Sequence, residues 1–458
     1  MFYYVNCLNK KSHGFFIKES NKKSKGHFVS NFKSTFSNKI SNSISRDLVR
    51  IGEGIFLCDR AFTRSKTLGL KTRELKINIP VENRELFVGL KDKYDKWASF
   101  ITHDVWDINF INFRGVKQDK FKIDLPNKPT KSIVSLFSDG LDSLCGAVYS
   151  LKKGENPVFV SHSPPGFNTV EKNINELKNK LGYKDADIHI ANFYFTVSDR
   201  NPENNRRNMF QERSRRSRPI LYLSFAAAVA IELGISTIRL NENGYMAINL
   251  PITGFKKGVD ISRHAHPETI KLFEDILNEL NPNDNMIKIE NPFFNYTKTQ
   301  QVKILKDVSE LIDNTKSCEY GRQQIATVIR SLKKNKINAT NIKECGLCIP
   351  CLVRRIAISG NDFGENNNRY AFHISHSALK NAKVPSLPLI NIVKDNALHL
   401  MEFCEAIRNM TINEFTRAYF YELSLLYRNS EDLTHNLPQI FKLHKTFANE
   451  FLNFVSKN

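Results

Sequence analysis

Two groups of residues in this sequence have the types and spacing that chemistry requires, and the first is the hexapeptide SDGLDS, Ser138–Ser143. It follows an apolar run at residues 133–137 and precedes a helical pattern. Small residues between a strand and a helix let backbone N–H groups approach a phosphate, and the helix dipole and serine hydroxyls favour an anion. Asp139 and Asp142 would repel that anion unless a divalent cation lay between them. The segment predicts a phosphate site with a metal ion, the alternative being a surface turn.

The second group is a set of cysteines near the end of the central part of the chain. Cys345, Cys348 and Cys351 form a C-x-x-C-x-x-C array whose spacing lets three thiolates converge on one ion, and Cys318 can supply a fourth ligand. Four thiolates predict a closed, structural zinc site; an iron–sulfur cluster and unligated core cysteines are the alternatives. The clustering favours metal over disulfides, as in a reducing compartment.

Composition limits the classes of protein that are possible. The chain has 458 residues, 41% of them hydrophobic and 25% charged, which is typical of a globular protein with two or three domains. No apolar run is long enough to span a membrane and no secretion signal is recognisable, so a cytoplasmic protein is expected. The net charge of +20 makes polyanions plausible partners.

The elements that must position these residues follow an alternating order after residue 132. Each apolar strand pattern is followed by a helical one, which predicts right-handed crossovers and an α/β fold with a parallel sheet. Ligands of such sheets bind beyond the carboxyl ends of the strands, where SDGLDS would lie. The predicted strands are 133–137, 157–162, 188–193 and 236–240, and the predicted helices are 143–152, 170–181 and 219–233.

Three domains are expected from the changes in pattern along the chain. Residues 1–128 predict an N-terminal α+β domain, with a loop-like stretch at 18–45 and a linker at 120–131. Residues 129–377 contain the strand–helix alternation and the cysteines, and residues 378–458 show only helical spacing, which predicts a helical appendage.

The hexapeptide SDGLDS resembles the SGGxDS signature of the PP-loop ATP pyrophosphatases, from which it departs at Asp139. With the four cysteines and Arg354 behind it, the chain is similar to the QueC family of 7-cyano-7-deazaguanine synthases, whose zinc is held by four such cysteines. The segments SRPILYLSF and ENPFFNYTKTQ resemble family segments in the same order and place Arg218 and Lys298 on the family's Arg and Lys. The resemblance covers residues 132–368.

This resemblance implies a PP-loop core that cleaves ATP to AMP and pyrophosphate. Asp142 would bind Mg²⁺, and Arg218 and Lys298 would neutralise the phosphates, although a solvated charge run and a surface lysine are the alternatives for these two. The residues expected to hold the pyrophosphate are Ser138, Asp139, Gly140, Leu141, Asp142 and Ser143.

Substrate contacts are expected from two further segments. Glu242 and Asn243 in NENGY are candidates, the alternative being a turn before Gly244. His264 and His266 in SRHAHPETI could bind a metal ion or act as a base, the alternative being a polar loop before a helix. Of the two, His266 is the substrate-binding candidate.

The layout of an N-terminal domain before a QueC-like core is similar to QatC of the bacterial QatABCD anti-phage systems. That resemblance implies adenylation of a 7-carboxy-7-deazaguanine-type substrate and transfer to ammonia or to an amine of a partner protein from the same defence operon. An RNA-modifying PP-loop enzyme is an alternative that the basic residues favour, and a non-catalytic nucleotide-binding scaffold is one that Asp139 favours. ATP, Mg²⁺ and Zn²⁺ are the expected cofactors; nucleic acid is a less favoured partner, and a membrane is not expected.

Overall fold

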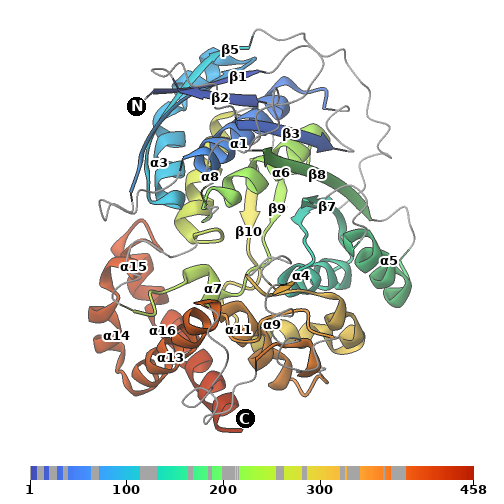
Figure 1. The fold of residues 1–458 in the computed structure, drawn as a ribbon, viewed down its shortest axis with the longest axis vertical. Helices are drawn as coiled ribbons and strands as arrows, with labels where there is room; N and C mark the ends of the chain where they lie inside the picture. The colour runs from blue at the N-terminus through green and yellow to red at the C-terminus, as the bar shows by residue number, and fades with distance from the viewer. Residues whose placement is uncertain are drawn as a thin grey trace.

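The protein is a mixed α/β structure in which one ten-stranded sheet lies toward one end and a group of helices lies toward the other (Figure 1). In the described part of the chain the strand order is β10-β9-β6-β7-β8-β3-β2-β1-β4-β5. The computed structural model describes residues 2–7, 15–19, 28–34, 40–62, 72–113, 132–162, 169–183, 188–198, 212, 214, 216–253, 263–280, 286–319, 325–326, 341–364, 367–372 and 388–457.

The half of the sheet that the central part of the chain forms is parallel, as the strand–helix alternation predicts. Its neighbouring strands pair in the order β10-β9-β6-β7-β8. The side chains of Ile133 and Val134 on β6 are buried because helices cover a parallel sheet on both faces. The strands are β6 (Ser132–Leu136), β7 (Asn156–His162), β8 (His189–Ser198), β9 (Thr237–Arg239) and β10 (Lys288–Glu290), and the helices are α4 (Leu141–Lys152), α5 (Thr169–Leu181) and α6 (Arg218–Leu233).

The N-terminal region continues the same sheet, because β3 pairs with β8 in antiparallel register. The predicted loop-like character of residues 18–45 is wrong in its described part, which contains β3 and the start of α1. Pairing with β2 and β8 stabilises β3 despite its Ser- and Lys-containing sequence. The elements are β1 (Phe2–Cys7), β2 (Phe15–Glu19), β3 (Phe28–Ser34), α1 (Ser43–Ala61), β4 (Glu74–Val81), α2 (Arg84–Gly89), α3 (Lys91–Thr102) and β5 (Val105–Asn112).

Helices α1 and α6 are packed closely against each other. Gly52 permits this approach, since a Cβ atom there would lie 2.8 Å from the Cβ of Ser224. At the end of α1 the buried carboxylate of Asp59 accepts hydrogen bonds from the N–H and Oγ of Ser217, at 3.1 and 2.7 Å. Arg73 pairs with this carboxylate and, at 2.5 Å, with Asp104. This charge network fixes the N-terminal region to the residue that precedes α6.

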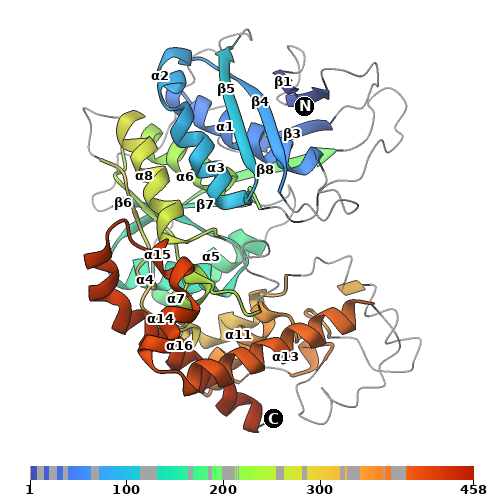
Figure 2. The ribbon, with the colours of Figure 1, turned by 90° about the vertical axis from the view of Figure 1, so that its left-hand side faces the viewer.

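The C-terminal region is helical in its described residues, as predicted, and lies at the end of the molecule opposite the N-terminal strands (Figures 1 and 2). Its longest helix, α16, contacts α13, α11 and α7. None of the described helices is long and apolar enough to cross a membrane. The predicted linker at 120–131 lies outside the described residues. The remaining elements are α7 (Gly244–Ile248), α8 (Pro267–Leu280), α9 (Lys298–Val302), η4 (Lys303–Asn314), α11 (Ile349–Ser359), η5 (Asn367–Arg369), α13 (Pro388–Asn409), α14 (Ile412–Ala418), α15 (Phe420–Ser424) and α16 (Ser430–Lys457).

The Asp59 network gives a testable prediction about stability. Asp59→Asn should lower the free energy of unfolding by about 1–3 kcal/mol, because Arg73 keeps Asp104 as its partner but loses one of two buried carboxylates, and Ser217 loses a charged acceptor. The same change at the exposed Asp395 should alter it by less than about 0.5 kcal/mol. Urea denaturation followed by circular dichroism measures both, and equal stability of the two variants would contradict the role given to Asp59.

Candidate active site

The loop between β6 and α4 has the compact geometry that its small residues allow. The hydroxyls of Ser138 and Ser143 lie 3.0 Å apart, and the Ser138 N–H donates to Ser143 Oγ at 3.0 Å. The Gly140 N–H donates to Ser138 Oγ at 3.1 Å. Two hydroxyls are therefore held together beside the first turn of the twelve-residue helix α4, where backbone N–H groups and the helix dipole favour an anion.

Asp139, the acidic residue in this loop, lies close to two cations. Its carboxylate is 3.6 Å from the Nζ of Lys316, and its carbonyl accepts the Lys316 N–H at 2.7 Å. The charge of Asp139 also helps to raise the pKa of Arg218, for which the hydroxyl of Tyr222 is the larger cause. The negative charge at this position is therefore compensated within the protein.

Asp142 and Lys298 form an ion pair between the first turns of α4 and α9. Lys298 is buried, whereas the Asp142 side chain keeps 34% of its surface exposed. A capping box between Thr297 and Gln300 begins α9 and fixes the position of Lys298. Two of the three residues that the sequence predicts as catalytic thus meet directly; the third is Arg218.

Glu242 and His264 form a second pair next to the first, with 2.6 Å between the carboxylate and the imidazole Nε2. Burial and the charge of Asp142 raise the pKa of Glu242. Burial alone would lower the pKa of His264, but the hydrogen bond and charge of Glu242 reverse this and raise it. The charges of Asp142 and Lys298 both act on Glu242, so the four side chains form one cluster, which we call the acid–base cluster.

Arg218 begins α6 at the edge of this cluster. Its guanidinium donates through Nε to the Tyr222 hydroxyl at 2.5 Å and lies over the Tyr222 ring, 5.1 Å from the centroid. Its charge also acts on His264. The side chain is exposed, so it can reach an incoming anion.

Asn243 and His266 have structural partners. The Asn243 amide donates to Glu242 at 2.8 Å, and its oxygen accepts the Met246 N–H as the N-cap of α7. His266 is buried, accepts the Glu268 N–H at 3.1 Å at the start of α8, and packs against Phe100. Burial and the charge of Arg263 lower the pKa of His266 to about 3, so its imidazole is neutral. The structure therefore brings His264, rather than His266, to Glu242.

The C-terminal helix α16 holds the segments that carry this cluster. Glu450 accepts hydrogen bonds from the hydroxyls of Thr297 and Thr299, each at 2.9 Å, on either side of Lys298. The ring of Tyr245 stacks on that of Phe447 with 3.6 Å between centroids. These contacts fix α7, which follows Glu242, and α9, which begins at Lys298.

The four predicted cysteine ligands come together at the start of α11. Their sulfur atoms all lie within 4.8 Å of one another, and two of the pairs are 3.9 Å apart. A tetrahedral zinc ion with Zn–S bonds of about 2.3 Å requires sulfurs about 3.8 Å apart. Hydrogen bonds from Cys318, Cys348 and Cys351 lower the pKa of Cys345, which favours the thiolate that binds metal. The cluster could hold zinc, with no open position for substrate.

A buried ion network joins the cysteines to the loop after β6. Glu344 accepts the N–H groups of Ser317 and Cys318 and pairs with Arg369 at 3.0 Å. Arg354, which is fully buried, donates to Thr315 Oγ1 at 2.6 Å and to the Ile312 carbonyl. These contacts position the segment that ends at Lys316, next to Asp139.

Several of these residues are absent from the sequence prediction. Lys316 and Glu450 lie in ordinary helical or polar surroundings, and their roles depend on contacts with distant segments. The sequence favours His266 over His264 as the substrate-binding candidate, whereas the structure places His264 against Glu242, a contact with a distant segment that the spacing of the two histidines does not predict.

Comparison with known proteins gives one family. A sequence model of the family described as "Queuosine biosynthesis protein QueC" matches residues 132–362, half of the chain. The match includes the loop after β6, the acid–base cluster, Arg218 and all four cysteines. No curated protein is similar enough to this chain to count as a match.

The cysteine geometry predicts the effect of losing one ligand. Cys348→Ser should reduce bound zinc from about one equivalent to less than half, and should lower the melting temperature, because metal binding stabilises the fold that forms the site. Cys404→Ser, a change at a buried cysteine outside the cluster, should leave the zinc content unchanged. Metal analysis of the purified variants and thermal unfolding measure this; full zinc content in Cys348→Ser would contradict the assignment.

Proposed function

Because this chain belongs to the QueC family, we propose that it is an ATP-using synthase of the PP-loop type that activates a carboxylate by transfer of AMP. The observation that carries the proposal is the convergence of Asp142, Lys298, Glu242 and His264 beside the loop after β6. The sequence motif SDGLDS and the paired serine hydroxyls support pyrophosphate binding at that loop.

The proposed reaction has two steps. A carboxylate oxygen of the substrate attacks the α-phosphorus of ATP; the bond from that phosphorus to the bridging oxygen breaks, and pyrophosphate leaves. An amine nitrogen then attacks the carbonyl carbon of the acyl-adenylate, AMP leaves with the electrons of the C–O bond, and the amine loses a proton. The product is an amide.

Each charged residue has a defined part in this scheme. Lys298 and Arg218 offset the negative charge that grows on the phosphates and lower the free energy of the transition state. Glu242, whose pKa is raised, is close to His264, and this pair can accept the proton that the attacking amine releases.

Mg²⁺ is proposed as a cofactor on the same site. The ion is usually held in proteins by one or two carboxylates together with the phosphates of the nucleotide, and Asp142, whose side chain is partly exposed, would supply a carboxylate. When bound, the ion would neutralise phosphate charge.

The proposed substrate is 7-carboxy-7-deazaguanine or a relative, and the acceptor is ammonia or an amine of a partner protein. The similarity of layout to QatC supports a role in anti-phage defence. Free cysteines throughout the described chain and a thiolate metal site support action in the reducing cytoplasm.

A scaffold without catalysis is the second candidate, and Asp139 is the observation that favours it. A carboxylate in the anion loop opposes phosphate binding. Its pairing with Lys316 weakens this objection. Nucleotide binding without turnover in the assay below would support the scaffold.

The proposal predicts the products of the reaction. With ATP, Mg²⁺, 7-carboxy-7-deazaguanine and ammonia, the protein should form AMP and pyrophosphate, measured by chromatography and phosphorus NMR. Asp142→Asn should lower this rate by about 10²–10³-fold, because it removes a charge that binds or orients the reacting phosphates. ADP as the only nucleotide product would overturn the proposal.

The matched control is Asp307→Asn. Asp307 is an exposed aspartate paired with Lys152, and the change should leave the rate within about twofold. If ammonia gives no product, intact-mass analysis of proteins encoded beside this one and expressed with it tests the amine acceptor: an adduct of the size of the base that depends on Asp142 is expected.

A further inference from the structure

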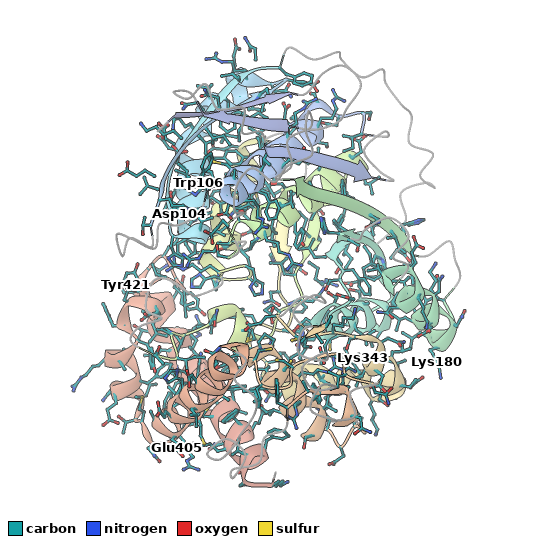
Figure 3. All side chains as sticks on the ribbon, in the orientation of Figure 1. Asp104, Trp106, Lys180, Lys343, Glu405 and Tyr421 are labelled. Carbon is teal, nitrogen blue, oxygen red and sulfur yellow. The ribbon has the colours of Figure 1, made fainter. Side chains whose placement is uncertain are left out.

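A pocket with no assigned role lies beside the loop after β6. Its volume is about 380 Å³, and it lies where the first turns of α5 meet the end of η4 and the segment before Cys345. Lys343, on its rim, is labelled in the lower half of Figure 3. The residues that line it are Lys172, Asn173, Asp313, Asn314, Thr315, Lys316 and Lys343.

The lining of the pocket is cationic. Three ammonium groups face one carboxylate, Asp313, which is already paired with Arg369 at 3.2 Å. Lys343 donates to the Asp313 carbonyl at 3.4 Å and has no carboxylate partner among the described residues. Lys172 is exposed and lies 3.6 Å from the half-buried Glu176, whose carboxylate also accepts a hydrogen bond from Asn314 at 2.6 Å. Like charges gathered around a concave surface attract a small anion of high charge.

Asn173 adds a buried amide to the lining of the pocket. This side chain is 4% exposed, and its Oδ1 has no hydrogen-bond partner in the described structure. Buried amide atoms are nearly always paired, because an unpaired one loses its hydrogen bonds to water. The unpaired atom is an acceptor, so the group that it meets is a donor, such as the P–OH of a partly protonated phosphate or a water that hydrates the anion.

The pocket shares one residue with the surroundings of the candidate site. Lys316 lines the pocket, while its backbone N–H donates to Asp139 and its ammonium lies 3.6 Å from the Asp139 carboxylate. Lys172 and Lys343 approach from α5 and from the segment before Cys345, whereas Asp142, Lys298 and Arg218 lie at the starts of α4, α9 and α6. The pocket lysines therefore come from other segments than the cations beside the acid–base cluster, and Lys316 is the residue that the pocket and the loop have in common.

We propose that this pocket is a second phosphoryl-anion site, which holds the pyrophosphate after it leaves the loop. The proposal rests on the proposed AMP-forming reaction, which releases that anion. Lysine side chains suit it because an ammonium is a mobile point charge that binds phosphate oxygens without fixed planar geometry. Lys316, shared by the loop and the pocket, exchanges its contact with Asp139 for one with the departing anion.

The test is direct binding of inorganic pyrophosphate to the full chain by isothermal titration calorimetry. The double variant Lys172→Ala, Lys343→Ala should raise the Kd for pyrophosphate at least about tenfold while changing the Kd for ATP less than about twofold. Lys180→Ala is the matched control, since this lysine is on the same helix, carries the same charge and does not line the pocket. It should leave both values unchanged. The binding of inorganic phosphate, measured in parallel, should depend on the same two lysines.

Two results would overturn the proposal. An unchanged Kd for pyrophosphate in the double variant would show that the lysines do not bind it. An equal loss of ATP and pyrophosphate affinity would make these lysines part of the nucleotide site. Binding is measured without turnover, so the two proposals are tested separately. If the protein forms AMP but the lysine variant binds pyrophosphate normally, only the pocket proposal is refuted. If the binding test succeeds but no AMP is formed, the anion site stands and the proposed reaction is refuted.

Discussion

The buried carboxylate of Asp59 is the interaction on which the position of the candidate site depends. A carboxylate without exposed surface is stable only when it is paired and hydrogen-bonded, and Arg73 and Ser217 supply those partners. Because Ser217 directly precedes Arg218, the contact that attaches the N-terminal region also determines where α6 begins. A region in which the sequence shows no recognisable chemistry thus positions one cation of the site.

The C-terminal region acts on the opposite side of the site in the same manner. Glu450 binds the hydroxyls on either side of Lys298, and the stacking of Tyr245 on Phe447 anchors the helix that follows Glu242. The charged side chains come from the part of the chain that matches the QueC family, while the regions outside that match hold two of the segments that carry them. Substitutions in the C-terminal region, far from the loop after β6 in sequence, are therefore expected to alter the geometry of the candidate site.

The parts of the structure that the sequence could predict are those with local causes. The alternation of β6, α4, β7 and α5 follows from apolar periodicity, and the cysteine array follows from ligand spacing. The sequence does not predict α1, whose interior glycines Gly52 and Gly54 lower helix propensity and are explained only by packing against α6 and β4. The choice between His264 and His266 likewise depends on which imidazole meets Glu242, a contact between segments about twenty residues apart.

Asp139 shows how a departure from the family motif can be accommodated. The cysteine cluster, Glu344 and Arg354 fix the segment that ends at Lys316, and Lys316 supplies the charge opposite Asp139. In the proposed reaction a phosphate would therefore meet a loop whose acidic charge is already paired, rather than an uncompensated negative site. Pairing with Lys316 would lower the Coulomb repulsion between Asp139 and that phosphate. A metal site with no open position would in this way influence the affinity for pyrophosphate, through the lysine whose position it determines.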